Sequence, residues 1–274
     1  MDFSENKKEF NNFLNVYEIL KKINISIPKI YEVYLKEKII VMEDFGNKKF
    51  DKILNKEELY VLLKLAIDNL IIIQNSVILD DLAKLEKYKY SDLEKEVSEF
   101  VDYYIPYKKI SKFPTEDFYA SWKKIFNDQK FEINSFVHKD YEFINLILLN
   151  NNSLHLKCGI IDFQGALIGF KGWDLFSILE NPRIDFTRKY NEDLIKYFYE
   201  NTNILSDFNS FRNHYYLLNL ARQTRLIGRW VKLFYEGHEK YLNFINPTKI
   251  RINSCLKNIH DNKLKNIYKM VFST

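Results

Sequence analysis

Two short polar segments of the sequence contain residue types that could carry out phosphoryl transfer. The first contains Asp140 and Asn145, and the second places Asp162 directly after an apolar run. A carboxylate such as that of Asp140 can orient an attacking hydroxyl group and accept its proton. Carboxylate and amide oxygens are hard ligands that suit Mg²⁺, which offsets the charge of a transferring phosphoryl group. Asp140 is therefore the candidate catalytic base, and Asn145 and Asp162 are the candidate magnesium ligands.

Short strands and a turn are predicted to hold these segments. Apolar runs at 135–138, 146–149 and 157–161 are typical of strands, and the polar residues 150–153 predict a turn between the last two. The resulting hairpin would bring the three polar side chains together in loops on a rigid scaffold. Alone, each of these residues is more simply explained as a turn former or helix cap. The combination of H-x-D-x-x-x-x-N, an apolar strand and I-D-F favours a catalytic role for the set.

The rest of the sequence predicts a small mixed segment followed by helices. Helical spacing of apolar residues, with Ser4 as the candidate cap, predicts a helix over 5–22. Strand-like runs follow at 30–34 and 38–42, and the turn after them marks a predicted lobe boundary at residue 46. Further helices are expected at 56–75, 91–104 and 115–128, and again from Asp162 to the C-terminus.

Composition excludes several classes of protein. The 274 residues are 46% hydrophobic with only 7 Gly and 5 Pro, so a large and mainly helical core is expected rather than disorder or a loop-rich sandwich. A net charge of +4 with 41 basic and 37 acidic residues is a mixed surface, so no nucleic-acid partner is expected. The most apolar run, 62–73, is interrupted by charges, which disfavours a membrane span. Two distant cysteines and a polar N-terminus predict a cytoplasmic protein.

The two polar segments resemble the catalytic and metal loops of the aminoglycoside phosphotransferase/choline kinase superfamily. The first reads His138-Lys-Asp140-Tyr-Glu-Phe-Ile-Asn145, and the second continues from Ile161-Asp162-Phe-Gln-Gly-Ala to Trp173-Asp174-Leu. The pattern is most similar to bacterial kinases of the N-acetylmuramate/N-acetylglucosamine anomeric type. The resemblance extends from near Met1 to about Arg229 and is most specific over 137–180.

The resemblance implies roles for further residues. His138 and Asp174 would brace the catalytic loop, although Asp174 could equally be an N-cap of the next helix. The segment Ile40-Val-Met-Glu-Asp-Phe-Gly46 resembles the link between two lobes, so the backbone of Met42, Glu43 and Asp44 would contact the adenine of ATP. The apolar floor beneath the adenine would be formed by Ile147 and Ile161. The implied cofactors are ATP and Mg²⁺, and the implied partner is a small acceptor molecule, either an amino sugar or a compound like an aminoglycoside.

The sequence departs from the pattern of this superfamily at three places. The first helix is not preceded by a glycine-rich loop or a strand lysine, so either the true start lies upstream or the nucleotide pocket has no roof. Gly165 stands where the similar kinases usually have Asp, which could weaken the support of the metal site. Only Glu9 and Glu18 are candidates, by charge alone, for the glutamate that pairs with the strand lysine.

The expected fold is therefore an α+β, protein-kinase-like two-lobe fold. Residues 1–46 would form a partial N-lobe with one helix, a strand pair and the hinge, and 47–274 a large helical C-lobe. The expected function is ATP-dependent phosphoryl transfer to a hydroxyl group of a small molecule, an amino sugar in the first instance. One alternative is a pseudokinase that acts as a binding or scaffold protein. A second is a nucleic-acid binder that uses Arg222, Arg225 and Arg229, which share one face of a helix but could also be an ordinary solvated face.

Overall fold

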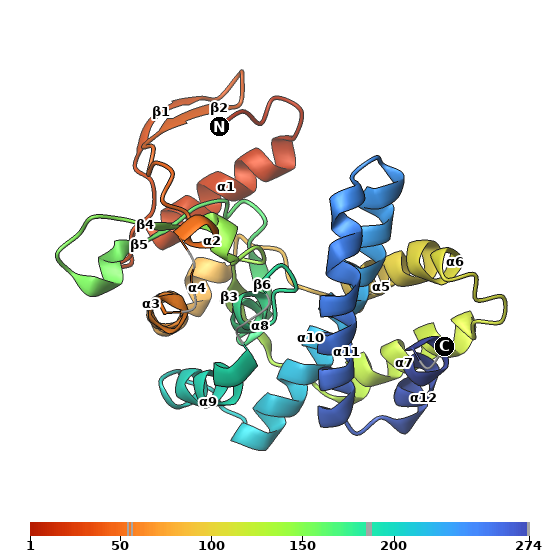
Figure 1. The fold of residues 1–274 in the computed structure, drawn as a ribbon. Coiled ribbons are helices and arrows are strands. Elements are labelled where there is room, and N and C mark those ends of the chain that lie inside the picture. The colour runs from red at the N-terminus through yellow and green to blue at the C-terminus, as the bar shows by residue number, and fades with distance from the viewer. Residues whose placement is uncertain (54, 56, 185–187, 273–274) are drawn as a thin grey trace. The chain divides into compact units, whose positions relative to one another are not determined.

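A computed structural model describes residues 1–53, 55, 57–184 and 188–272 (Figure 1). The contacts divide the chain into two compact units. The first unit comprises Met1–Lys87, Glu132–Asn181 and Phe186–Leu205, and the second comprises Tyr88–Phe131, Pro182–Asp185 and Ser206–Thr274. The predicted lobe boundary at residue 46 lies within the first unit and stays a prediction.

The first unit contains all the described strands and six α-helices. Its strands are β1 (Ile30–Tyr34), β2 (Ile39–Met42), β3 (Ile133–Val137), β4 (Leu146–Leu148), β5 (Cys158–Ile160) and β6 (Leu167–Phe170). Its helices are α1 (Lys7–Leu20), α2 (Phe50–Ile53), α3 (Leu59–Ser76), α4 (Leu79–Leu82), α8 (Trp173–Leu179) and α9 (Asn191–Glu200), with a further 3-10 turn at Phe143–Asn145.

Helix α1 buries one apolar stripe and begins two residues later than the sequence predicts. Phe10, Phe13 and Val16 recur at helical spacing and are all buried. The helix is capped by Asn6, whose side chain accepts a hydrogen bond from the backbone N–H of Glu9 at 3.1 Å. The prediction of a Ser4 cap is wrong, because the backbone N–H of Ser4 instead donates to Asp2 Oδ1 at 2.8 Å in the preceding turn.

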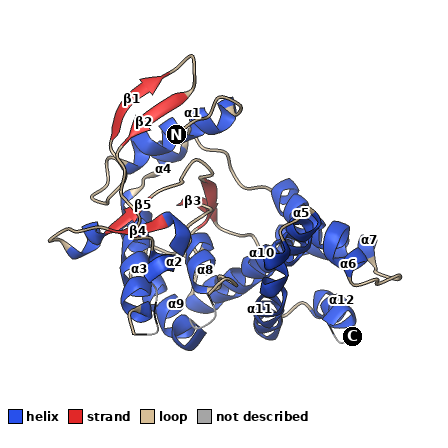
Figure 2. Ribbon diagram, turned by 45° about the horizontal axis from the view of Figure 1, so that its top comes forward, coloured by secondary structure: helices blue, strands red, loops and turns tan. Residues whose placement is uncertain are grey.

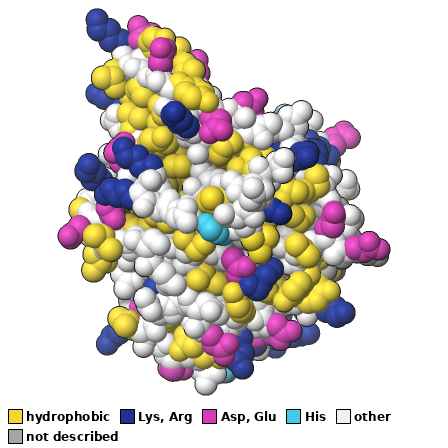
Figure 3. All heavy atoms as spheres, turned by 90° about the vertical axis from the view of Figure 1, so that its left-hand side faces the viewer, with side chains coloured by type: hydrophobic (Ala, Val, Ile, Leu, Met, Phe, Trp, Pro, Cys, Tyr) yellow, Lys and Arg dark blue, Asp and Glu magenta, His cyan; other side chains and the backbone are white. Residues whose placement is uncertain are grey.

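Strands β1 and β2 form an antiparallel pair whose outer face is apolar and exposed. Val33 pairs with Ile40, which is buried, whereas Tyr34 pairs with Ile39 and both side chains are exposed. The far edge of β2 is occupied by the first residues of the chain, since Ile40 N donates to Met1 O at 2.9 Å. Hydrophobic side chains gather on the upper projection of the surface view, where this hairpin lies (Figure 3).

The predicted hairpin around the polar segments is present. Strands β4 and β5 pair antiparallel, with Ile147 opposite Gly159, and lie between the β1–β2 hairpin and α3 (Figure 2). Strand β3 pairs not with β4 but with β6, a strand that the sequence did not predict. The pairing of β3 and β6 is close, because a Cβ atom at Gly169 would lie 2.8 Å from the side chain of Val137. A residue larger than glycine would therefore separate the two strands.

Helix α3 supplies much of the core of the first unit. Leu62, Leu63, Ala66 and Leu70 are buried, which explains its nearly continuous apolar sequence. Among the described residues it is the one helix long and apolar enough to cross a membrane, and 56% of that stretch is buried within the protein. Core helices of ordinary domains share this composition, so the helix is weak evidence for a membrane span.

The second unit is helical. Its elements are α5 (Tyr90–Glu99), a π-helical turn (Phe100–Tyr104), α6 (Ile105–Tyr107), α7 (Thr115–Asp128), α10 (Phe208–Tyr235), a 3-10 helix (Glu239–Phe244), α11 (Ile245–Asn258) and α12 (Asn262–Phe272). Helix α10 packs along α5, the π-helical turn and α11. At the closest approach a Cβ atom on Gly228 would lie 2.2 Å from the carbonyl oxygen of Glu99, so only glycine fits this crossing.

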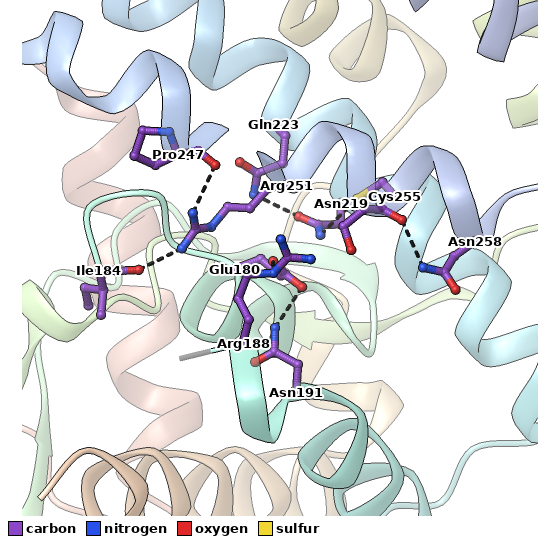
Figure 4. Close-up of polar contacts among 11 residues, drawn as sticks. Glu180, Ile184, Arg188, Asn191, Asn219, Gln223, Pro247, Arg251, Cys255 and Asn258 are labelled. Carbon is purple, nitrogen blue, oxygen red and sulfur yellow. Dashed lines mark hydrogen bonds and ion pairs between the residues drawn. The ribbon is translucent and has the colours of Figure 1, made fainter. Parts of the chain in front are cut away.

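Several polar side chains of α10 and α11 contact other parts of this unit. Arg229 Nε donates to Glu99 Oε2 at 2.7 Å, and Arg222 is only 1% exposed. The interpretation of the arginine series as a solvated face is therefore wrong for Arg222. Arg251, also buried, donates to the carbonyl oxygens of Pro247 at 3.0 Å and Ile184 at 2.7 Å (Figure 4).

Candidate functional site

The turn that follows β3 is held by Asp174, which lies in the first turn of α8. The Asp174 carboxylate accepts the backbone N–H of His138 at 2.7 Å and that of Lys139 at 3.0 Å. The N-cap position of α8 is occupied by Gly172, so the alternative that Asp174 is an N-cap is wrong. Asp174 is 1% exposed, and two charge-assisted hydrogen bonds compensate for burying its carboxylate. They fix the backbone immediately before Asp140, whose side chain is exposed.

The side chain of His138 connects the two polar segments through a hydrogen bond. Its Nε2 lies 3.1 Å from the carbonyl oxygen of Ile161, which can only accept, so we assign the proton to Nε2. The ring is 1% exposed, and burial lowers the pKa of His138, although the nearby Asp140 and Asp162 act in the opposite direction. A neutral imidazole that donates to the backbone next to Asp162 links the turn that carries Asp140 to the segment that carries Asp162.

Asn145 and Asp162 approach the same turn from β4 and β5. Asn145 Nδ2 donates to the carbonyl oxygen of Asp140 at 2.9 Å, and Ile161 N donates to the carbonyl oxygen of Asn145 at 3.1 Å. Asp162 Oδ1 accepts from Gln164 Nε2 at 2.9 Å. These bonds place Asp140, Asn145 and Asp162 around one small region, as the sequence predicts.

The backbone is strained at both polar segments. Lys139 has φ = 76° and Asp162 has φ = 67°, both in the left-handed region that residues with a Cβ atom rarely adopt. Such conformations persist where surrounding contacts over-determine them, and they concentrate at functional sites. Asp174 supplies those contacts at Lys139. Lys38, Lys109 and Lys130 also have positive φ, so the strain at Lys139 and Asp162 supports a functional site only together with the residue types found there.

The predicted nucleotide-binding segment lies against the β4–β5 hairpin. A Cβ atom at Gly159 would lie 2.6 Å from the ring of Phe45, so the residue after Asp44 packs directly onto β5. Glu43 N donates to the carbonyl oxygen of Lys29 at 2.8 Å, and Met42 ends β2. Ile147, which is buried, sits opposite Gly159 in the same hairpin.

Ile161 completes this arrangement, since it directly follows β5. The five residues predicted to bind the adenine are thus brought to one hairpin and the segment that packs on it. Their contacts with a nucleotide remain a prediction.

Comparison with known proteins identifies the fold. No protein-family model matches the chain. The chain is 22% identical over 255 residues to an N-acetylmuramate/N-acetylglucosamine kinase of Neisseria meningitidis serogroup B, and the match covers 88% of this chain and 73% of that protein. A protein of the same name from Caulobacter vibrioides is 23% identical, covering 84% of this chain and 66% of the relative, so the chain spans about two thirds to three quarters of these relatives.

Solved structures agree on the fold. A GDP complex of an aminoglycoside 2′-phosphotransferase superposes with a TM-score of 0.61 at 14% identity, covering 89% of this chain and 81% of that one. An ethanolamine kinase of Plasmodium vivax gives a TM-score of 0.55 at 14% identity, covering 92% and 72%. The chain has the protein-kinase-like fold of the aminoglycoside phosphotransferases and choline/ethanolamine kinases. The α+β fold class and the resemblance that the sequence predicted are both confirmed.

The donor atoms of this kinase-like site suit a magnesium ion. Because Asn145 donates through Nδ2, its amide oxygen is the atom that can bind a cation, and Asp162 has a second carboxylate oxygen beside the one held by Gln164. No group of three or more His, Cys, Asp or Glu side chains that could hold a metal occurs within the described ranges. Mg²⁺ commonly takes only one or two protein ligands and completes its shell with water and phosphate oxygens, so this small set fits.

Gly165 lies directly beside the candidate base of the kinase-like site. A Cβ atom at this position would contact Asp140 Oδ2 at 3.4 Å. A side chain here would therefore cover one side of the Asp140 carboxylate, and glycine leaves that side open. Having Gly165 where similar kinases usually have Asp therefore changes the immediate surroundings of the Asp140 carboxylate.

Sequence reasoning missed three residues that support the kinase-like site. Tyr141 donates to the carbonyl oxygen of Ala66 in α3 at 2.9 Å and packs edge-to-face on His138. Gln164 contacts Asp162, and Asn12 of α1 contacts the loop that follows it. Gln164 lies within the quoted motif and could have been singled out, but nothing in the sequence marks Asn12. The candidates Glu9 and Glu18 are both exposed, and Glu18 pairs with Lys21 on the helix surface.

Proposed function

We propose that this chain transfers the γ-phosphoryl group of ATP to a hydroxyl group of a small molecule, with an amino sugar as the acceptor. The convergence of Asp140, Asn145 and Asp162 on two strained, braced turns is the observation that carries the proposal. Relatives named as N-acetylmuramate/N-acetylglucosamine kinases support the amino sugar, and the GDP complex of a structure with the same fold supports nucleotide binding.

Each residue then has a definite task. Asp140 accepts the proton of the acceptor hydroxyl as it attacks the phosphorus, and Asp174 and His138 hold the turn that presents it. Asn145 and Asp162 would hold Mg²⁺, which neutralises charge on the transferring phosphoryl group when bound. The backbone of Met42, Glu43 and Asp44, with Ile147 and Ile161 beneath, would hold the adenine.

The compartment we propose is the cytoplasm. Cys158 and Cys255 are both buried and form no disulfide, as a reducing compartment would allow. The nucleic-acid alternative is disfavoured, because Arg229 is engaged by Glu99 and Arg222 is buried. The pseudokinase alternative has no support among the named relatives.

The experiment that tests the proposal measures phosphoryl transfer from ATP to N-acetylated amino sugars by the wild-type chain and by Asp140→Asn. Removing the base should lower kcat by about 10²- to 10⁴-fold, the usual contribution of general base catalysis. Asp193→Asn, at an exposed position of α9, is the matched control and should retain wild-type kcat. Undiminished turnover by Asp140→Asn would contradict the assignment of the base. Nucleotide binding without turnover on any hydroxyl acceptor would instead favour the pseudokinase alternative.

A further inference from the structure

Helix α1 contacts the loop that carries Asp162 through the side-chain amide of Asn12. Asn12 Nδ2 donates to the carbonyl oxygen of Gln164 at 2.6 Å and to that of Ala166 at 2.9 Å. Both hydrogens of one amide group are therefore used on two backbone acceptors of the same loop. The contact spans more than 150 residues of sequence, since the separation of Asn12 and Gln164 is 152.

Gln164 connects the Asn12 contact to Asp162. While the backbone carbonyl of Gln164 is held by Asn12, its side chain donates from Nε2 to Asp162 Oδ1 at 2.9 Å. Gln164 Oε1 is buried and has no hydrogen-bond partner among the described residues, so Nε2 is the only end of this amide that the structure engages. The Gln164 side chain thus occupies Oδ1 of Asp162 and leaves Oδ2 for a cation.

The neighbouring residue of α1 makes a second contact with the same loop. The Phe13 ring stacks on the Phe163 ring with centroids 4.6 Å apart and an angle of 17° between the planes. Both rings are 1% exposed. Consecutive residues of α1 therefore hold consecutive parts of the loop, one by packing and one by hydrogen bonds, and only the hydrogen bonds fix its direction.

We propose that Asn12 is a positioning residue that keeps Asp162 in its left-handed conformation and thereby maintains the affinity of the site for Mg²⁺. This inference rests on the proposed function only for the identity of the metal. Asp162 at φ = 67° needs surrounding contacts to stay in place, and the Asn12–Gln164–Asp162 chain supplies them. Residues that orient metal ligands commonly change metal affinity 10- to 100-fold when they are replaced.

The test compares Asn12→Asp and Asn12→Leu with Asn11→Asp. The aspartate variant cannot donate and would face two carbonyl oxygens, and the leucine variant removes the hydrogen bonds without adding charge. Asn11 is the exposed neighbour on the same helix and carries the same change of type. The first readout is hydrogen–deuterium exchange of the 161–168 segment in the free protein. The second is binding of Mn²⁺ with ADP, followed by electron paramagnetic resonance, with Asp162→Ala as the reference for a lost site.

Both Asn12 variants should exchange faster at 161–168 and should bind Mn²⁺ about 10-fold or more weakly, with Asn11→Asp like wild type. Exchange at 161–168 that matches wild type in both variants would overturn the inference, whatever the enzyme's activity. Faster exchange with unchanged Mn²⁺ affinity would overturn it as well. If wild type and Asp162→Ala bind Mn²⁺ equally, the proposed metal site itself fails, and that result is distinct because it does not involve Asn12.

Discussion

Single side chains determine the geometry of the two turns at the proposed centre. Asp174 accepts two backbone N–H groups of the turn that precedes Asp140, and His138 donates to the backbone of Ile161. Neither side chain needs to touch a substrate to matter, because a base that is displaced by a fraction of an ångström loses its alignment with the acceptor hydroxyl. The proposed chemistry therefore depends on buried residues behind Asp140 as well as on Asp140.

The buried His138 should make the stability of the protein depend on pH. Burial lowers its pKa below the usual 6.5, so between the two values the unfolded state binds more protons than the folded state. The free energy of unfolding should thus be largest above pH 6.5 and should fall as the pH decreases below it, by up to about 1.4 kcal/mol per pH unit.

Urea unfolding of wild type and His138→Gln at pH 7.5, 6.5 and 5.5 measures this effect. Gln can place an amide N–H near the position of Nε2 and does not titrate, so the variant should lose less stability between pH 6.5 and 5.5 than wild type. Equal losses in the two proteins would show that His138 does not contribute to the acid sensitivity.

At the scale of elements, α10 crosses the end of α5 so closely that a side chain at Gly228 should destabilise the protein. A Cβ atom on Gly228 would lie 2.2 Å from Glu99 O and 2.6 Å from Phe100 N, and backbone atoms cannot move aside as a side chain can. Gly228→Ala should lower the free energy of unfolding by about 1–3 kcal/mol, as overpacking does. A Gly→Ala change inside an uncrowded helix would instead raise it by about 1 kcal/mol.

Chemical denaturation of Gly228→Ala beside wild type decides the sign. Asn209→Ala, at an exposed position in the first turn of α10, is the control and should stay within about 0.5 kcal/mol of wild type. A stabilised Gly228→Ala protein would mean that α10 and the π-helical turn lie further apart than the structure places them.

At the scale of the whole molecule, ligand binding should be visible as added stability. A ligand that binds only the folded protein at 100 times its Kd stabilises it by about 2.7 kcal/mol. Adding ATP and MgCl₂ should therefore raise the Tm of wild type, by roughly 2–4 °C for each kcal/mol in a chain of this size. Differential scanning calorimetry of Asp162→Ala and Asp193→Asn tests whether the Tm increase depends on the proposed metal site. Only Asp162→Ala removes a proposed metal ligand. The same Tm increase in Asp162→Ala would place nucleotide binding elsewhere.

The local parts of the site were predictable because they depend on residues that are neighbours in sequence. The β4–β5 hairpin follows from two apolar runs and the polar turn at 150–153, and α7 has the bounds that its periodicity predicts. Asn145 directly precedes β4 and Asp162 follows β5, so their approach follows from the hairpin. Asp140 follows β3 instead, and the Asn145 side chain contacts its backbone. The types of these three residues alone indicate oxygen ligands and a base.

The contacts that hold the site were decided only by tertiary structure. Strand β6 is four residues long, contains Gly169, and is recognisable only through its register with β3. In the sequence Asp174 is a plausible helix cap, and only the fold shows that it binds the turn that precedes Asp140. Likewise, only the packing of α1 on the loop after Asp162 distinguishes Asn12 from the other asparagines. Periodicity and turn chemistry are local properties, whereas the partner of a buried polar group depends on packing between segments far apart in the chain. The sequence by itself thus determined which residues could do the chemistry, and the tertiary structure determined which residues keep them in place.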